Sequence, residues 1–210
     1  GRWPVVNYAT RAIVPANPRD VVPQPEERRL RLKQRLSDLA AKAAADPDGP
    51  TGDPPVPEQL APAQKIALLG CAACRGFCCL SGGEHAYQTE ESVRRVMKSD
   101  PEKSPEAWVG QFLSYLPERS FEGGCLYQGE RGCTLPRSMR SDTCHRFYCR
   151  PLRGLLDFVR DTPPEEPILV TAALEGEVAR IVLLDAEGMK VLYPAPPPSP
   201  KPDAPGQSCG

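Results

Sequence analysis

The residues with the most distinctive chemistry in this sequence are its nine cysteines. Eight of them follow the pattern C-x2-C-x3-C-C-x45-C-x7-C-x10-C-x4-C, whereas Cys209 stands apart in a Pro-rich stretch and is left out of the set. Cysteine thiolates are soft ligands that bind iron, iron–sulfur clusters and zinc. The spacing therefore predicts metal ligands in two groups, 71–79 and 125–149. The eight ligands are Cys71, Cys74, Cys78, Cys79, Cys125, Cys133, Cys144 and Cys149.

Disulfide bonds are the main alternative use of eight cysteines, since an even number could pair in a secreted chain. Four thiols within residues 71–79 are too crowded for separate bridges, and the adjacent Cys78 and Cys79 could bond to each other only under strain. No secretory leader opens the sequence given, although its first residue is Gly rather than Met. We therefore expect a cytoplasmic protein whose thiols bind metal.

The sequence leaves the identity and the number of the metals open. Iron, alone or in an iron–sulfur cluster, and zinc both accept four thiolates. Two four-cysteine sites, or one cluster and one mononuclear ion, are equally consistent with eight ligands. His85 and His145 could add nitrogen ligands, but a single histidine is more often solvated or bonded within the protein. His145 directly follows Cys144, so we expect its side chain to point away from that thiol.

Arginines surround the second cysteine group and have a physical role whichever metal binds. Several thiolates on one metal leave a net negative charge, which a guanidinium can offset by donating to sulfur. Arg140 and Arg146 are the predicted cofactor-binding residues, with Arg131 and Arg150 nearby and ordinary solvation as the alternative. The carboxylates are scattered without a convincing pair, and no glycine-rich nucleotide loop follows a strand.

Three stretches around the cysteines form a recognisable set: CAACRGFCC (71–79), CLYQGERGC (125–133) and RSDTCHRFYC (140–149). Together they resemble the YkgJ/YcgN-type cysteine-cluster family, described as zinc- or iron-chelating, over roughly residues 70–150. The resemblance implies metal binding through the clustered cysteines and names no reaction. Ser141 stands where that family usually has Pro, and His145 stands where Arg is common, which puts the coordination set in doubt.

The flanks of the cysteine region separate by composition. Residues 1–24 are interrupted by Pro and predict an extended arm, whereas 25–45 predict an amphipathic helix that opens on acidic residues. The Pro- and Gly-rich stretch 46–57 predicts a linker, and 195–210 predict a disordered Pro-rich tail. The cysteine-cluster metal-binding domain is expected to occupy 58–194.

Within this domain the apolar periodicity predicts helices over 58–69 and 151–160, and further helices that start after Thr89 and Ser104. Three β-rich runs separated by turn residues predict a meander, 168–174, 177–184 and 189–194. The fold class expected is a small, mostly helical α+β domain stabilised by metal. It carries a short C-terminal antiparallel β-meander and irregular flanks.

Charge and hydropathy restrict the functions to consider. The formal net charge is −1, from 26 basic and 27 acidic side chains, which argues against a nucleic-acid-binding surface. No apolar run approaches the roughly 18 residues that cross a bilayer. The first hypothesis is an iron or iron–sulfur protein in electron transfer, sensing or modification. The alternatives are a structural zinc module that binds a protein partner through the N-terminal helix or the tail, and an iron-dependent modifying enzyme.

Overall fold

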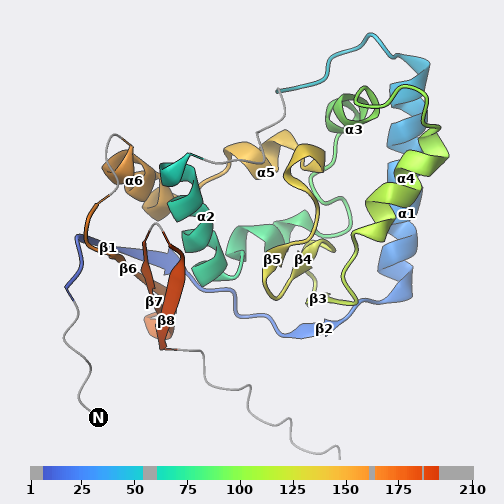
Figure 1. The fold of residues 1–210 in the computed structure, drawn as a ribbon. Coiled ribbons are helices and arrows are strands. Elements are labelled where there is room, and N and C mark those ends of the chain that lie inside the picture. The colour runs from blue at the N-terminus through green and yellow to red at the C-terminus, as the bar shows by residue number, and fades with distance from the viewer. Residues whose placement is uncertain (1–6, 54–60, 161–163, 186, 194–210) are drawn as a thin grey trace, which may run out of the picture.

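Two hydrophobic cores organise the computed structural model, which describes residues 7–53, 61–160, 164–185 and 187–193. In Figure 1 a sheet and the helices that pack on it lie on the left, a group of helices lies on the right, and shorter elements lie between them. The predicted α+β class is confirmed. Among the helices described here, none combines the length and apolar character needed to span a bilayer.

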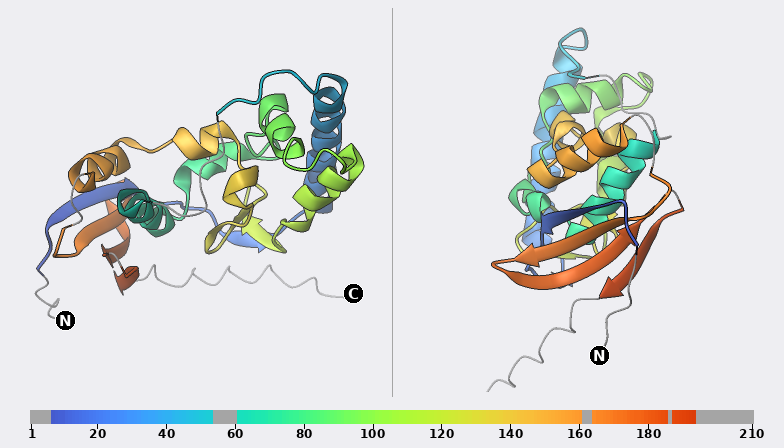
Figure 2. Two further views of the ribbon diagram at one scale, coloured as in Figure 1. Left: turned by 45° about the horizontal axis from the view of Figure 1, so that its top comes forward. Right: turned by 90° about the vertical axis from the view of Figure 1, so that its left-hand side faces the viewer.

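The sheet-side core lies between a four-stranded sheet and two helices (Figure 2). The strand order is β1-β6-β7-β8, in which β1 runs parallel to β6 and the other neighbours are antiparallel. The predicted meander is therefore confirmed, but its fourth strand was not foreseen. The strands are β1 (Thr10–Pro15), β6 (Ile168–Leu174), β7 (Glu177–Leu184) and β8 (Met189–Tyr193); the helices are α2 (Pro62–Cys74) and α6 (Arg150–Val159).

The helix-side core is formed chiefly by three helices on the opposite side of the molecule. Leu32, Leu36 and Ala43 are buried along α1 at helical spacing, as the apolar pattern predicts. Thr89 and Ser104 accept hydrogen bonds from backbone N–H groups in the first turns of the next two helices, so both predicted N-caps are confirmed. The helices are α1 (Glu26–Ala45), α3 (Glu90–Met97) and α4 (Pro105–Ser114).

Residues 1–24 were predicted as an extended arm, and the described part of this stretch is extended but includes two strands paired with distant segments. Residues 10–15 form β1 at one edge of the four-stranded sheet, and Val14 is 1% exposed there. Strand β2 (Val21–Pro23) pairs with β3 (Arg119–Phe121). Prolines on either side of a short strand hide it from a search for long periodic segments. Ala12, Val14 and Ala16 are buried in alternation, and this period of two is the pattern by which the strand could have been predicted.

The predicted linker is also more ordered than its composition suggests. Carbonyl groups of Pro50, Thr51 and Asp53 accept hydrogen bonds from two buried arginines of α3, Arg94 and Arg95. Proline and glycine exclude helix here, but they leave backbone carbonyls free to be held by side chains. The rest of the predicted linker, 54–57, and the predicted tail, 195–210, lie outside the described residues.

Short elements fill the junction between the two cores. Helix α2 was predicted to end at residue 69 but continues to Cys74, and it stops where Arg75 and Gly76 adopt φ values of 58° and 70°. Only a left-handed turn of this kind lets the chain reverse immediately after the helix. The junction elements are the 3-10 helices η1 (Phe77–Gly82) and η2 (Arg137–Met139), strands β4 (Gln128–Gly129) and β5 (Gly132–Cys133), and helix α5 (Asp142–Arg146).

Candidate metal centre

The eight predicted cysteine ligands lie in the elements of this junction or beside them, all of them as free thiols. Cys71, Cys74 and Cys149 belong to the sheet-side core or pack against it. The helix-side core receives three others in the same way, namely Cys79, Cys125 and Cys133. The side chain of Cys78 forms a hydrogen bond with that of Cys79, and the Cys144 thiolate raises the pKa values of Cys79 and Cys125. Among the described residues, however, no three or more His, Cys, Asp or Glu side chains form a group that could hold a metal ion.

The cysteines on the sheet side come mainly from helix ends. Cys71 and Cys74 lie in the last turn of α2, and Cys149 is the residue that precedes α6, which packs against α2. Burial raises the pKa of the Cys71 thiol, and neighbouring thiolates, Cys78 first, raise it further. Burial also raises the pKa of Cys74 to about 11, although the backbone N–H of Phe77 donates to its Sγ at 3.2 Å and opposes the shift.

The cysteines on the helix side come from turns that backbone contacts hold together. The N–H of Cys125 donates to the carbonyl oxygen of Cys79 at 3.0 Å, and Cys133 pairs with Gln128 across β4 and β5. Burial raises the pKa of Cys125 to about 12, and the Cys133 thiolate is the next largest cause. A Cβ atom on Gly82 would lie 2.8 Å from Cβ of Cys125, so only glycine allows this approach.

The adjacent Cys78 and Cys79 connect the two sides. A hydrogen bond between their side chains lowers the pKa of Cys78 and raises that of Cys79, because it stabilises one thiolate at the other's expense. The hydroxyl of Tyr87 donates to the carbonyl oxygen of Cys78 at 3.0 Å. Ala86 and Tyr87 adopt positive φ values of 48° and 56°, which side chains other than glycine rarely do. Such strain persists where the surrounding structure fixes a particular geometry.

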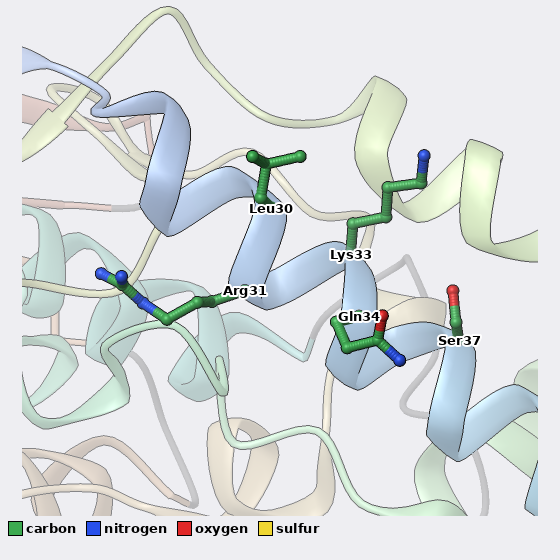
Figure 3. A pocket seen from close by; sticks show the side chains of 5 residues that line it. All are labelled: Leu30, Arg31, Lys33, Gln34 and Ser37. Atoms are coloured by element: carbon green, nitrogen blue, oxygen red, sulfur yellow. The ribbon is translucent and has the colours of Figure 1, made fainter.

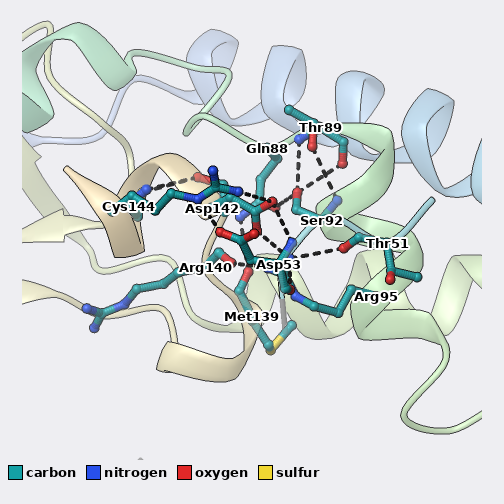
Figure 4. A network of polar contacts seen from close by, with 12 residues as sticks. Thr51, Asp53, Gln88, Thr89, Ser92, Arg95, Met139, Arg140, Asp142 and Cys144 are labelled. Atoms are coloured by element: carbon teal, nitrogen blue, oxygen red, sulfur yellow. Dashed lines mark hydrogen bonds and ion pairs between the residues drawn. The ribbon is translucent and has the colours of Figure 1, made fainter. Parts of the chain in front are cut away.

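A polar network fixes helix α5, which carries Cys144 (Figure 4). Arg95, only 8% exposed, pairs with the Asp142 carboxylate and donates to the carbonyl oxygen of Arg140 at 2.7 Å. Asp142 also accepts the N–H of Asp53 at 3.1 Å. Although burial opposes it, this hydrogen bond and those from Arg95 hold the pKa of Asp142 below its ordinary value. Helix α5 buries no residue of its own, so the network supplies its anchorage.

Ser141 connects this network to the sulfur of Cys144. Its hydroxyl accepts the N–H of Cys144 and lies 3.4 Å from the Cys144 Sγ, to which it donates. Serine therefore caps the short helix at the position where the resembled family usually has proline. Burial raises the pKa of Cys144 even though the residue as a whole is exposed, and the Ser141 hydrogen bond opposes the shift.

The predicted arginines divide into two kinds. Arg140 lies close to the thiols: its guanidinium donates to the carbonyl oxygen of Cys133 at 3.2 Å, and its charge lowers the pKa of Cys144, against the stronger effect of burial. Arg146 instead pairs with the Asp53 and Asp142 carboxylates, and Arg131 and Arg150 are exposed. The sequence analysis missed Arg28, whose guanidinium donates to the Gly124 carbonyl oxygen at 2.6 Å and whose charge acts on Cys125.

The two histidines have other surroundings. His85 is exposed, and its Nδ1 accepts the N–H of Tyr87 at 3.0 Å. His145 is half-buried beside Arg137, Arg95 and Arg140. Burial, followed by the positive charges of these arginines, lowers its pKa. Its Nε2 has no hydrogen-bond partner among the described residues. The structure therefore gives neither histidine a place in a set with the thiols.

A surface hollow of about 440 Å³ lies over α5 and the turn that precedes α3. Aromatic, hydroxyl and charged side chains line it, so it offers several kinds of contact at once. Cys144 is exposed next to Thr143, one of the lining residues, whereas the other cysteines in the described part of the chain are buried or half-buried. The lining residues are Tyr87, Thr89, Glu91, Ser141, Asp142, Thr143, Arg146 and Phe147.

Comparisons with family models, curated proteins and solved structures gave no match for this chain. The geometry of the junction therefore carries the functional argument. Its donor set is all thiol, which suits a soft metal. Backbone N–H groups and Arg140 stand close to the sulfurs, as expected around ligands that become thiolates on binding.

Proposed function

We propose that this chain binds metal through its eight clustered cysteines, and that the metal is iron, alone or in an iron–sulfur cluster. The observation that carries the proposal is the convergence of residues 71–79 and 125–149 at the junction of the two cores. Packing alone does not require so many free thiols close together, whereas metal binding would account for them. Thiolate-held iron supplies a centre for one-electron redox chemistry or sensing.

The electrostatics of the thiols support a cationic occupant. Neighbouring thiolates repel one another, and this repulsion adds to burial in raising the pKa values of Cys71 and Cys125. A bound metal cation removes both penalties, because it replaces the thiol protons and neutralises the sulfur charges. Metal binding would thus release protons, and the free energy of binding would stabilise the folded state.

Zinc is the second candidate, favoured by the position of the thiols between two cores. Structural zinc sites are closed, tetrahedral and commonly all-cysteine, and they hold together segments that bury little by themselves. Helix α5 buries no residue, so its segment matches that description. A zinc module would present other surfaces to a protein partner.

Metal analysis of protein purified without oxygen separates these candidates. The visible spectrum is recorded, and iron, acid-labile sulfide and zinc are quantified per chain. A coloured protein with iron supports the first proposal, and a colourless one with stoichiometric zinc supports the second. A protein that contains neither metal, and whose eight cysteines pair as disulfides, would overturn both.

The remaining expectations belong to the same proposal. The eight thiols are free in the described part of the chain, which suits a reducing compartment such as the cytoplasm.

A protein partner could bind the exposed face of α1, where Leu30 is 54% exposed and lines a shallow hollow together with Arg31 and Lys33 (Figure 3). The hollow beside Cys144 would suit an iron-dependent modifying enzyme, since it could admit a substrate side chain.

A further inference from the structure

We infer that the guanidinium groups of Arg75 and Arg180 form a binding site for a phosphate-type oxyanion, beside the C-terminal end of helix α2. Arg75 is the residue that follows α2, and Arg180 lies in the middle of β7, the strand against which this helix packs. The inference involves no cysteine and is independent of the proposed metal. It adds a ligand of a different kind, an anion with several oxygen acceptors.

Strand β7 places Arg180 on the face of the sheet that the helices cover. Arg180 stands opposite Ala172 of β6, which is 1% exposed in the sheet-side core. Opposite residues of an antiparallel pair point to the same face. The Nε atom of Arg180 is buried and has no hydrogen-bond partner among the described residues. A buried donor on a charged group is costly when it lacks an acceptor, so a ligand oxygen at this point would stabilise the site.

Arg75 occupies a backbone position that ordinarily favours glycine. Its φ of 58° is left-handed, and helices commonly end on a glycine in this conformation. The carbonyl oxygen of Arg75 accepts hydrogen bonds from the side-chain amides of Asn17, at 3.1 Å, and Gln128. The surrounding contacts therefore hold an uncommon conformation, and such outliers cluster at ligand-binding sites. The turn itself has no need of an arginine, which indicates a role for the side chain.

A ring contact positions the Arg75 guanidinium. Its Cζ lies 4.8 Å from the centroid of the Phe121 ring, and Phe121 is 0% exposed. A cation–π contact of this kind fixes the side chain but supplies no oxygen acceptor for its N–H donors. Arg75 and Arg180 are both half-buried, so a ligand from solvent can reach the two guanidinium groups.

The two guanidinium groups repel each other, and an anion bound to both would turn this repulsion into attraction. Burial lowers the pKa of Arg180, and the positive charge of Arg75 lowers it further. In the part of the chain that the structure describes, neither side chain has an ion pair with a carboxylate. A phosphate group carries about two negative charges near neutral pH and binds guanidinium groups through paired N–H donors. It therefore matches two arginines better than a carboxylate, which has a single charge.

Calorimetric titration of the full-length protein with inorganic phosphate tests the site. The ionic strength is held constant with sodium chloride, and metal content is measured before and after, so that neither screening nor loss of metal imitates binding. Arg180→Gln and Arg75→Gln remove the two guanidinium groups. Arg11→Gln is the matched control, because Arg11 is exposed on the opposite face of the same sheet. The wild type and the control should bind one phosphate per chain, and each site variant should bind it about tenfold or more weakly, since charge-assisted hydrogen bonds are lost.

Thermal unfolding distinguishes a ligand site from a packing role. Without phosphate, Arg180→Gln should be at least as stable as the wild type, because the substitution removes a repulsion and a partly buried charge. Added phosphate should raise the Tm of the wild type and of Arg11→Gln, and should leave that of Arg180→Gln unchanged. An Arg180→Gln protein that is destabilised without phosphate would overturn the inference, because the guanidinium would then serve the fold.

The source of the phosphate group is tested by comparing inorganic phosphate with glycerol phosphate. Tighter binding of the ester would support a site for a phosphorylated small molecule, and tighter binding of the inorganic ion would support a site for the free anion. Equal affinities in the wild type and both site variants, or no binding by the wild type at about 10 mM of either compound, would overturn the inference. Neither of these results would bear on metal binding by the cysteines.

Discussion

The two sides of the cysteine junction are built in different ways. On the sheet side, Cys71 and Cys74 extend from a helix whose buried face packs on the sheet, so regular structure positions the thiols. On the helix side, Cys125 lies in a turn-rich loop, Cys133 in the two-residue strand β5 and Cys144 in the short helix α5. Side-chain contacts hold the last two segments in place. We therefore expect polar contacts, and the proposed metal, to matter more for the helix-side thiols, because local hydrogen bonding holds less of their backbone.

Removal of the proposed metal should give the largest effect, a difference in amide hydrogen exchange between the two sides. We expect chelation to increase amide hydrogen exchange across residues 122–149 far more than in the strands β6 and β7, whose ladder is independent of the junction. Hydrogen-exchange mass spectrometry before and after chelation measures this. Equal loss of protection in the sheet would show that both sides unfold together and would remove the distinction.

A change of pH should affect the metal-free protein strongly. Burial raises the pKa of the Cys74 thiol to about 11 and that of Cys125 to about 12, both above the ordinary value of 9.0. Thiols of this kind stay protonated in the folded state while the unfolded chain ionises. The stability they give is therefore complete below about pH 9 and is lost as pH rises through the folded pKa values. Thermal unfolding at increasing pH should show this loss without metal, and a flat profile with metal bound.

Loss of the buried guanidinium of Arg95 should be the most damaging single substitution in the polar network. Arg95→Met removes a buried cation from Asp142 and the side-chain donor from the carbonyl groups of Thr51 and Arg140, which we expect to cost about 3 kcal/mol. Arg146→Met is the matched control, because Arg146 pairs with the same Asp142 from an exposed position and should cost less than about 1 kcal/mol. Denaturant unfolding measures both. Similar costs would show that burial of Arg95 is unimportant.

Alanine substitutions at two glycines should have opposite effects on stability, one in the junction and one on the surface of α4. Gly82→Ala brings a Cβ atom to 2.8 Å from Cβ of Cys125, and relief of this contact should cost about 2 kcal/mol and displace the thiol. Gly110→Ala meets no atom within 4 Å and lies inside α4, so it should stabilise the protein by up to about 1 kcal/mol. Stability and metal content are measured together. Unchanged metal content in Gly82→Ala would argue against Cys125 as a ligand.

The smallest effect should come from two N-cap serines. Ser141→Ala and Ser104→Ala each remove a side-chain cap, and each should cost about 1 kcal/mol. Only Ser141 also donates to a sulfur, that of Cys144. In metal-free protein, iodoacetamide should therefore alkylate Cys144 at a changed rate in Ser141→Ala and at the wild-type rate in Ser104→Ala. Equal rates in both variants would show that the hydroxyl does not influence the thiol.

Much of the fold could be predicted from local pattern. The spacing of Leu32, Leu36 and Ala43 predicts α1, and Thr89 and Ser104 mark the starts of α3 and α4. Strand β1 was missed because it is short and its partner β6 lies far away in the sequence. Such a parallel pairing leaves no local signal beyond alternation. The buried Arg94 and Arg95 were missed too, because two adjacent arginines on a helix are ordinarily solvated.

The sequence by itself determined which residues can act as ligands, because thiol chemistry and the spacing of Cys71, Cys74, Cys78 and Cys79 are properties of the chain. Only the tertiary structure decided which cysteines face each other. The packing of α6 on α2 brings Cys149 to the first cluster, and the network around Arg95 fixes the helix that carries Cys144. These two residues are five positions apart, yet only Cys149 packs against the sheet-side core, because contacts between distant segments set their surroundings.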